Sequence, residues 1–370
     1  MIRILTIIGT RPEAIKMAPI ALELAKYPDR ILSRLCVTAQ HRDMLDQALN
    51  LFGVEPDYDL DIMQPGQTPT QAAHSIFQRL EPVLTQERPH WVLAQGDTTT
   101  AMAAALAAYY QRIPAAHVEA GLRTRDRWEP FPEEINRRLC DAISELHFAP
   151  TEGAKRNLLR EGIDESGIYV TGNPVIDALL LTLHKPHNLE YVLPQIPWDK
   201  KIILMTAHRR ESFGEPLRNI CRAAAEIVRL HPEAHILYPV HPNPNVQEAA
   251  REFLQSHPGV TLTSPLDYHT LVHVMNRSYF VLTDSGGLQE EAPSLGKPVL
   301  VLRQKTERPE AVEAGTAKLA GACQETIVAE ACRLLEDEAE YQRMARAINP
   351  YGDGKASERI VKILLESTSA

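Results

Sequence analysis

Two series of alternating strand-like and helix-like segments constrain the fold of this chain more than any other feature. The strand candidates are short apolar segments, which in the first series are residues 2–8, 35–39, 91–94, 115–118, 146–149 and 168–170. In the second series they are residues 202–205, 234–238, 260–262, 280–282 and 299–302. Helical patterns separate them, and the last pattern predicts one helix over 326–346. Continuous apolar strands alternating with helices are typical of parallel sheets that are covered on both faces.

A proline-rich stretch without clear periodicity, residues 184–199, separates the two series. The sequence therefore predicts an α/β protein with two doubly wound domains, and it places the boundary between them near this stretch. In doubly wound sheets, ligands bind beyond the carboxyl ends of the strands. We therefore expect the two parallel sheets to face a cleft that holds the ligand.

Composition and charge exclude several classes of function. The 370 residues include 48 acidic and 39 basic side chains, and the formal charge of -9 argues against a broad basic face for duplex nucleic acid. The longest near-continuous apolar stretch, residues 101–110, is half of the ~20 residues that a membrane span needs. The N-terminus shows no signal-peptide pattern. We therefore expect a cytoplasmic protein with neither nucleic acid nor membrane as a partner.

The cysteines and histidines show no metal-binding pattern. The five cysteines include no C-x-x-C pair, and the fourteen histidines include no H-E-x-x-H pair. An odd number of cysteines in a chain of this length favours free thiols in a reducing compartment. We predict neither a disulfide framework nor a metal site.

The first candidate site follows the first strand, at Gly9-Thr10-Arg11-Pro12-Glu13-Ala14-Ile15-Lys16. A tight turn before a helix presents backbone N–H groups and the positive end of the helix dipole, which both favour an anion. Arg11 and Lys16 would add positive charge there. The alternative is an ordinary loop with surface cations. The segment matches neither the G-x-G-x-x-G fingerprint nor the Walker A loop, so NAD and ATP lose support.

Three carboxylates lie at strand-to-helix transitions of the N-terminal half. Asp97 and Glu119 each follow a strand, and Glu133 stands where the next helix begins. Asp97 could instead be a helix N-cap, and Glu133 and Glu134 could simply complement a helix dipole. Carboxylates gathered in a closed site raise one another's pKa. The three are therefore candidates for a general acid and a general base.

Basic residues follow the first strand of the C-terminal half, at His208, Arg209 and Arg210. Guanidinium groups match the oxygens of a diphosphate, and a histidine can donate to them. The alternative is a solvated basic turn. His241 has a similar place after the next strand, where the flanking prolines alone could explain a rigid loop.

The most specific segment is Asp284-Ser285-Gly286-Gly287, which separates a strand from a helix. Glycines allow a phosphate to approach bare backbone N–H groups. Glu290 or Glu291, one turn further on, could accept hydrogen bonds from ribose hydroxyls, and Arg308 after the next strand could close the same site. The alternative is a capping box at Ser285, which would not explain the paired glycines.

Together these segments resemble the non-hydrolysing UDP-N-acetylglucosamine 2-epimerase family. The motifs that carry the resemblance are Gly9–Lys16, Gly96–Thr100, His117–Arg123, Pro130–Glu134, Ala207–Glu211 and Asp284–Gly287. They run in order along the chain and continue to Asn349–Ala356, so the resemblance covers nearly the whole sequence.

The resemblance implies a glycosyltransferase-B-type α/β fold, with two Rossmann-like domains around a deep cleft. The N-terminal domain is expected at 1–172 and the C-terminal one at 173–354, with the last helix, 355–370, packed back on the first domain. It implies reversible inversion at carbon 2, which interconverts UDP-N-acetylglucosamine and UDP-N-acetylmannosamine for polysaccharide biosynthesis. It implies elimination of UDP to a 2-acetamidoglucal intermediate, followed by re-addition. No cofactor is implied, and the family is expected to form homodimers.

The resemblance also assigns roles to residues of this sequence. The implied catalytic residues are Asp97, Glu119, Glu133 and His208. The implied substrate-binding residues are Arg11, Lys16, Ser285, Gly286, Gly287, Glu291 and Arg308. Which carboxylate removes the proton stays open.

A second, allosteric site for UDP-N-acetylglucosamine as activator is a further feature of many bacterial members. Gln40, His41, Arg210 and His241 resemble parts of that site. The sequence departs from one version of the pattern, because Asp43 stands where some members have Gln and residues 63–67 lack an Arg. Two alternatives to the epimerase remain: a UDP-sugar glycosyltransferase of the same fold, and a non-catalytic UDP-sugar sensor.

Overall fold

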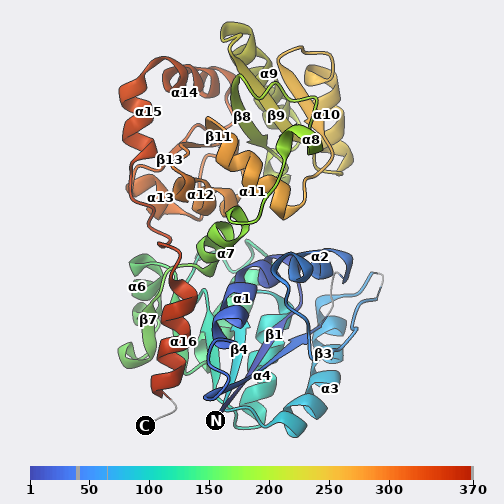
Figure 1. Cartoon of the computed structure of the whole chain (residues 1–370), viewed down its shortest axis with the longest axis vertical. Helices are drawn as coiled ribbons and strands as arrows, with labels where there is room; N and C mark the ends of the chain where they lie inside the picture. The colour runs from blue at the N-terminus through green and yellow to red at the C-terminus, as the bar shows by residue number, and fades with distance from the viewer. Residues whose placement is uncertain (39–41, 65, 368–370) are drawn as a thin grey trace. The chain divides into compact units, whose positions relative to one another are not determined.

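The computed structural model describes residues 1–38, 42–64 and 66–367, apart from the side chains of 42–44. Contacts divide the chain into two compact units, drawn in Figure 1. Unit 1 comprises Met1–Thr182 with Tyr351–Ala370, and unit 2 comprises Leu183–Pro350. Each unit holds one sheet in which all strand pairs are parallel. The predicted fold class, α/β with two Rossmann-like parallel sheets, is confirmed.

The sheet of unit 1 has the strand order β3-β2-β1-β4-β5-β6-β7. Its strands are β1 (Ile2–Ile8), β2 (Ile31–Val37), β3 (Tyr58–Asp59), β4 (Trp91–Gln95), β5 (Ala115–Val118), β6 (Leu146–Ala149) and β7 (Ile168–Val170). The order reverses between β1 and β4, which pair directly. This reversal creates a switch point, where the two following loops separate and leave room for a ligand.

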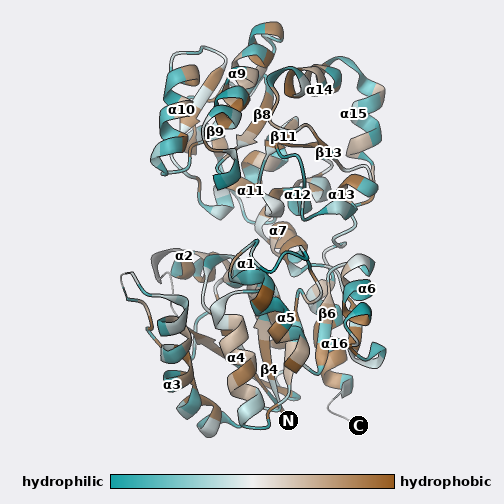
Figure 2. Cartoon of the chain, turned by 180° about the vertical axis from the view of Figure 1, so that it is seen from behind, coloured by the Kyte–Doolittle hydropathy of each residue, from teal (hydrophilic) through white to brown (hydrophobic). Residues whose placement is uncertain are grey.

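The helices of unit 1 cover both faces of this sheet. They are α1 (Arg11–Leu24), α2 (Arg42–Phe52), α3 (Pro69–Glu87), α4 (Thr99–Tyr110), α5 (Glu133–Ile143), α6 (Glu152–Arg160), η1 (Glu165–Gly167) and α16 (Ala356–Ser367). Helices α1, α2 and α16 pack together on one face, and α3, α4 and α5 pack together on the other (Figures 1 and 2). α7 (Pro174–Leu183) lies at the junction with unit 2.

Unit 2 repeats the architecture with the order β10-β9-β8-β11-β12-β13. Its strands are β8 (Lys201–Thr206), β9 (Ala234–Pro239), β10 (Val260–Thr263), β11 (Phe280–Thr283), β12 (Val299–Val301) and β13 (Ala317–Leu319). Its helices are α8 (Leu189–Val192), η2 (Arg210–Ser212), α9 (Glu215–Leu230), α10 (Pro244–Leu254), α11 (Tyr268–Arg277), α12 (Gly286–Glu291), η3 (Ala292–Leu295), α13 (Pro309–Glu313), α14 (Gln324–Glu336) and α15 (Glu338–Ala345). The switch point lies between β8 and β11.

The strands form the centre of each hydrophobic core. Every residue of β4 is buried, and Figure 2 shows apolar residues along this strand. Helix α4 is rich in alanine, and its buried positions include Ala103, Ala104 and Ala107. Small side chains allow the helix backbone to lie close to the sheet and to α3 and α5. The sheet and its helices therefore form a rigid support for the loops at the strand ends.

Several predicted elements differ from the structure. The single helix predicted over 326–346 is wrong, because it is two helices, α14 and α15, separated at Asp337. The Asp337 carboxylate accepts the backbone N–H of Glu340 at 3.0 Å and so caps the start of α15. The strand predicted at 35–39 begins earlier, as β2, and its last predicted residue lies outside the described residues. The sequence did not predict the short strands β3 and β13.

Across the residues that the structure describes, no helix has both the length and the apolar character that crossing a membrane requires.

Candidate functional site

The loop between β1 and α1 is held by a buried carboxylate. Glu13 accepts the backbone N–H groups of Gly9 at 2.7 Å and Thr10 at 2.6 Å, and the Thr98 hydroxyl at 2.5 Å. Burial raises the pKa of Glu13, although these hydrogen bonds act in the opposite direction. The carboxylate therefore fixes the β1–α1 turn against the start of α4. A Thr-x-x-Glu spacing is the pattern of a capping box, so Thr10 and Glu13 could have been recognised from the sequence.

Gly9 is required by the close approach of two side chains. A Cβ at this position would lie 2.3 Å from the Thr100 hydroxyl oxygen and 2.4 Å from that of Thr38. These two hydroxyls are buried and 3.1 Å apart. A side chain at position 9 would therefore displace the hydrogen-bonded threonines that join β2 to α4.

Glu119 is the centre of a buried polar network at the end of β5. Lys16 on α1 donates to both carboxylate oxygens, at 2.7 and 2.6 Å, and Asn173 donates to one of them at 2.9 Å. Gln95, the last residue of β4, also donates to this carboxylate. Only 5% of the Glu119 side chain is exposed. The alternative of Lys16 as an ordinary surface cation is therefore wrong.

The backbone of Glu119 is in the left-handed region, with φ +66°. A residue other than glycine pays of order 1–3 kcal/mol for a sparsely populated conformation of this kind. The hydrogen bonds from Lys16, Gln95 and Asn173 hold the carboxylate in place despite this cost. Strain of this kind, retained at a strand end beside a switch point, is typical of a functional residue.

Asp97 is not the N-cap of α4, so that alternative is wrong. The N-cap is Thr98, whose hydroxyl accepts the backbone N–H of Ala101 at 3.1 Å. The Asp97 carboxylate instead forms an ion pair with Arg137 on α5, and its carbonyl accepts from Asn136 at 3.0 Å. About a third of the Asp97 side chain remains exposed. This carboxylate is therefore oriented from α5 and still open to a ligand.

Glu133 lines a cavity of about 490 Å³ in unit 1. The same cavity is lined by the N-cap residues of four helices, which are Thr10 of α1, Thr68 of α3, Thr98 of α4 and Pro132 of α5. Four helix N-termini therefore border the cavity, and the positive ends of helix dipoles stabilise negative charge. The cavity is therefore suited to an anionic or strongly polar ligand, with the Glu133 carboxylate on its wall.

Glu134 has a different role from its neighbour. It is buried and accepts the backbone N–H groups of Thr124 and Arg125, both at 3.1 Å. Its interpretation as a group that merely complements the helix dipole is therefore wrong. Glu134 fixes the loop that follows β5.

A buried ionic chain joins His117, Asp141 and Arg123 near the end of β5. His117 on β5 contacts the Asp141 carboxylate at 2.6 Å and the Gly96 carbonyl at 2.7 Å, and Arg123 donates to Asp141 at 2.6 Å. Burial alone would lower the pKa of His117, but the charge and hydrogen bond of Asp141 outweigh burial and raise it. Burial would raise the pKa of Asp141, but His117 and Arg123 lower it. The chain ties β5 to α5 and to the Gly96 turn.

In unit 2, Asp284 organises the loop after β8. This fully buried carboxylate accepts the backbone N–H groups of His208 at 2.6 Å and Arg209 at 2.7 Å. The His208 imidazole lies 3.5 Å from the other Asp284 oxygen and stacks on the ring of His241, with centroids 5.1 Å apart. Burial lowers the pKa of His208, and the charges of His241 and Arg209 lower it further. The negative charge of Asp284 acts in the opposite direction but does not outweigh burial. His208 and Arg209 are therefore held by the fold, whereas Arg210, the first residue of η2, is exposed as a solvated turn predicts.

Gly286 and Gly287 begin α12 beside the end of β11. The capping box proposed as an alternative at Ser285 is wrong, because its side chain makes no capping hydrogen bond in the described part of the chain. A Cβ at Gly286 would lie 3.1 Å from a Glu307 oxygen. The Arg308 guanidinium forms an ion pair with the buried Glu290, and Glu291 accepts the Tyr268 hydroxyl at 2.7 Å. Both acids of α12 are therefore held by side-chain partners, Glu290 by Arg308 and Glu291 by Tyr268.

The structure places the predicted residues in both units, on the loops that follow the strands and on the helices that begin there. Those in unit 1 are Arg11, Lys16, Asp97, Glu119 and Glu133. Those in unit 2 are His208, Arg210, His241, Ser285, Gly286, Gly287, Glu291 and Arg308. Gln40 and His41 lie outside the described residues. Sequence reasoning missed the roles of Glu13, Gln95, Asn173, Arg137 and Tyr268.

A family model described as UDP-N-acetylglucosamine 2-epimerase matches residues 23–365. A protein of Yersinia pestis named UDP-N-acetylglucosamine 2-epimerase is 54% identical in an alignment of 369 positions that covers 98% of each chain. The protein of the same name from Escherichia coli strain K12 is 53% identical, again over 98% of both chains.

A solved structure gives the same result. The UDP-GlcNAc 2-epimerase of Neisseria meningitidis, crystallised with UDP-GlcNAc bound, is 49% identical and superposes with a TM-score of 0.91. The match covers 99% of this chain and all of that one. On the motifs, the family model and these similarities, the chain belongs to the UDP-N-acetylglucosamine 2-epimerase family.

Proposed function

We propose that this protein interconverts UDP-N-acetylglucosamine and UDP-N-acetylmannosamine by inversion at carbon 2. The observation that carries the proposal is the Glu119 network, in which a strained, buried carboxylate after β5, beside the switch point, is paired with Lys16. Family membership defines the substrate class, and the chemistry explains why the site has carboxylates and cations.

The proposed reaction proceeds by elimination and re-addition. A carboxylate removes the proton from carbon 2, and the electron pair of that C–H bond forms the C1–C2 double bond. The bond between carbon 1 and the diphosphate oxygen breaks, which releases UDP and 2-acetamidoglucal. UDP then adds to carbon 1 while carbon 2 is protonated on the opposite face. The reaction is redox-neutral overall, so no cofactor has to accept electrons.

The carboxylates of unit 1 suit the two proton transfers. Protonation on opposite faces requires acid and base groups on both sides of the sugar ring. Asp97, Glu119 and Glu133 would supply them, with Glu119 oriented by Lys16 and Asp97 by Arg137. Arg11, the first residue of α1, would contribute positive charge beside the sugar diphosphate.

The residues of unit 2 suit the UDP group. The N–H groups of Ser285, Gly286 and Gly287 and the guanidinium of Arg308 would bind the diphosphate as negative charge develops on it. Glu291 would accept hydrogen bonds from the ribose hydroxyls. His208 would donate to the departing diphosphate, and its backbone is held for this role by Asp284.

Regulation by substrate as activator is a further part of the proposal. Arg210 and His241 would contact the activator, together with Gln40 and His41. The cavity of unit 1 is bordered by Met63, Gln64 and Gly66, the segment in which some family members have an Arg. We also propose a cytoplasmic homodimer that supplies sugar nucleotides for polysaccharide biosynthesis.

Approach to equilibrium from both directions tests the proposed activity. Proton NMR of the anomeric signals should show one final mixture, whether purified protein is given UDP-N-acetylglucosamine or UDP-N-acetylmannosamine. No acceptor should be needed. Turnover only after an acceptor is added would indicate a glycosyltransferase, and binding without turnover, with and without activator, would indicate a sensor. Either result would contradict the epimerase.

A further inference from the structure

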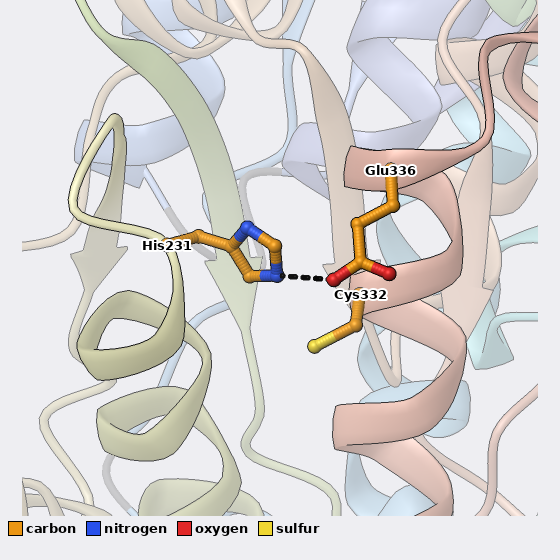
Figure 3. A group of neighbouring side chains, drawn as sticks. All are labelled: His231, Cys332 and Glu336. Atoms are coloured by element: carbon orange, nitrogen blue, oxygen red, sulfur yellow. Dashed lines mark ion pairs between the residues drawn. The ribbon is translucent and has the colours of Figure 1, made fainter.

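His231, Cys332 and Glu336 form a group in unit 2 that has no role in the proposed reaction. One imidazole nitrogen, the thiol sulfur and one carboxylate oxygen all lie within 4.8 Å of one another. Figure 3 shows the three side chains pointing toward a common space. No sequence pattern predicts the group, because His231 and Cys332 lie far apart in the chain and only the fold brings them together.

The group lies at the amino ends of the strands of unit 2, whereas the proposed UDP residues lie at their carboxyl ends. His231 ends α9 just before β9 begins at Ala234, and Glu336 ends α14. The first residue of β8, Lys201, donates to the Leu335 carbonyl at 3.3 Å, which places the end of α14 at the amino end of that strand. Asp284 and Ser285 follow the carboxyl end of β11, which pairs in parallel with β8. A ligand bound at the group would therefore not touch the substrate residues of unit 2.

The orientation of the His231 ring is fixed from one side. Its Nδ1 lies 3.1 Å from a Glu233 carboxylate oxygen, and its Nε2 faces a Glu336 oxygen at 3.3 Å. The imidazole side chain is 90% buried. The Nε2–Glu336 contact, drawn in Figure 3, has the distance of an ion pair but not the geometry of a hydrogen bond, so Nε2 is buried without a hydrogen-bond partner among the described residues. A hydrogen bond from Nδ1 to Glu233 leaves the Nε2 lone pair directed at Cys332 and Glu336. Outer carboxylates hold metal-binding histidines in this manner.

The other two groups come from one face of α14. Cys332 and Glu336 are four residues apart, so their side chains are neighbours on the helix surface. Cys332 is partly buried, and its thiol is not oxidised to a disulfide. Two-thirds of the Glu336 side chain is exposed, so it can rotate toward the other two groups and leave one side open to water.

The simpler explanation of this group is a protonated His231 that bridges Glu233 and Glu336. That explanation accounts for the two carboxylates but gives no role to the thiol. A sulfur, a directed imidazole nitrogen and a carboxylate are the ligand types that zinc prefers, whereas Mg²⁺ and Ca²⁺ prefer oxygen alone.

We propose that His231 Nε2, Cys332 Sγ and the Glu336 carboxylate bind one divalent transition-metal ion of the zinc type, with water as the fourth ligand. On binding, the thiol releases its proton to solvent, and the thiolate and carboxylate together balance the charge of the ion. Tetrahedral ligands at 2.0–2.3 Å from zinc lie roughly 3.3–3.8 Å apart, so only small side-chain movements are needed. The ion would join the end of α9 to the end of α14, two helices that pack together.

Cobalt provides a direct test, because thiolate-bound Co²⁺ has a charge-transfer band in the near ultraviolet. The full-length protein, freed of metal with a chelator, should develop this band with one equivalent of Co²⁺ and lose it when Zn²⁺ is added. Cys332→Ser should abolish the band. Cys323→Ser is the matched control, because Cys323 is an exposed thiol beside the carboxylate of Glu325 and should leave the band unchanged.

Two further variants distinguish a metal site from the alternative, in which a protonated His231 bridges Glu233 and Glu336. Glu233→Gln should weaken Zn²⁺ binding by about 10- to 100-fold while the band remains, because it removes only the outer carboxylate. His231→Gln should abolish tight binding, and circular dichroism without metal should match that of the wild type. If Cys332→Ser does not fold, the loss or retention of tight metal binding in His231→Gln still tests whether the group binds the ion. Absence of the band in the wild type, or its persistence in Cys332→Ser, would overturn the proposal and leave the bridging imidazolium.

Discussion

At the residue scale, Glu119 differs from the other candidate carboxylates in its confinement. It is buried, has a positive φ and accepts from three side chains, whereas Asp97 and Glu133 are more accessible. A carboxylate held this firmly can act with little reorganisation, which is how preorganised groups stabilise a transition state. Its geometry therefore makes Glu119 the most constrained participant in the proposed proton transfers.

Glu119→Gln should lower kcat by about 10²- to 10⁴-fold, the usual contribution of a general acid or base. Binding of UDP should be retained, because the UDP residues are assigned to unit 2. Steady-state kinetics and calorimetric titration with UDP would measure the two effects separately. The exposed Glu248→Gln is the control and should leave both unchanged. Near-normal turnover in Glu119→Gln would remove this residue from the chemistry.

Gly9→Ala should destabilise the protein by about 1–3 kcal/mol, the usual cost of overpacking. Its Cβ would collide with the Thr38 and Thr100 hydroxyls at 2.4 and 2.3 Å. Gly287→Ala is the matched control, because the nearest atom to its Cβ would be 3.7 Å away. Thermal unfolding of both variants would test the difference, and equal stability of the two would contradict the packing described for Gly9.

At the element scale, the buried ionic chain of β5 and α5 makes stability depend on pH. Asp141→Asn should lower the apparent free energy of unfolding by about 3–5 kcal/mol near neutral pH, because it leaves Arg123 and His117 without their buried partner. The pKa of Asp141 is lowered from its ordinary 3.8, so its contribution is present above 3.8 and is lost as pH falls through the folded-state pKa. The pKa of His117 is raised from 6.5, so its contribution is complete below 6.5 and declines as pH rises through the folded-state pKa.

Urea unfolding of wild type and Asp141→Asn at a series of pH values would measure this effect. The difference between the two should be largest in the weakly acidic range and should shrink in strong acid. If the difference in the free energy of unfolding does not change with pH, the charges of Asp141 and His117 do not contribute to stability as described.

The break between α14 and α15 gives a second prediction at this scale. Asp337→Ala should cost about 0.5–2 kcal/mol, because the N–H of Glu340 loses its cap. Asp337→Asn should restore most of the stability, since Asn caps helices equally well. Thermal unfolding would compare the two, and an equal loss in both would indicate that the negative charge, and not the cap, stabilises α15.

The element scale also shows what could be predicted from the sequence. The alternation of apolar strands and helices predicted both sheets. Parallel strands are buried on both faces, so each one is visible in the sequence as a continuous apolar segment. The same logic placed Asp97, Glu119 and Ser285 at strand ends. Asn173 and Arg137 could not be found in this way, because their contacts with Glu119 and Asp97 depend on how distant segments pack. The helix break at Asp337 was missed because helical periodicity continues across it.

At the scale of the whole molecule, the two units divide the proposed reaction between proton transfer and UDP binding. UDP at a hundredfold excess over its Kd should stabilise the wild type by about 2.7 kcal/mol. Arg308→Ala should lose most of this stabilisation, whereas Glu119→Gln should keep it. The change in Tm on adding UDP would measure this stabilisation in the wild type and in each variant. A loss in Glu119→Gln equal to that in Arg308→Ala would contradict the division.

Deuterium incorporation at carbon 2 tests the central claim most directly. Purified protein is incubated with UDP-N-acetylglucosamine in deuterated water, and the carbon 2 proton is followed by NMR. The elimination mechanism predicts that deuterium replaces this proton in the UDP-N-acetylmannosamine product, and that Glu119→Gln slows the exchange as much as it slows turnover. Product that retains its original proton at carbon 2, or substrate unchanged after long incubation with and without activator, would contradict it.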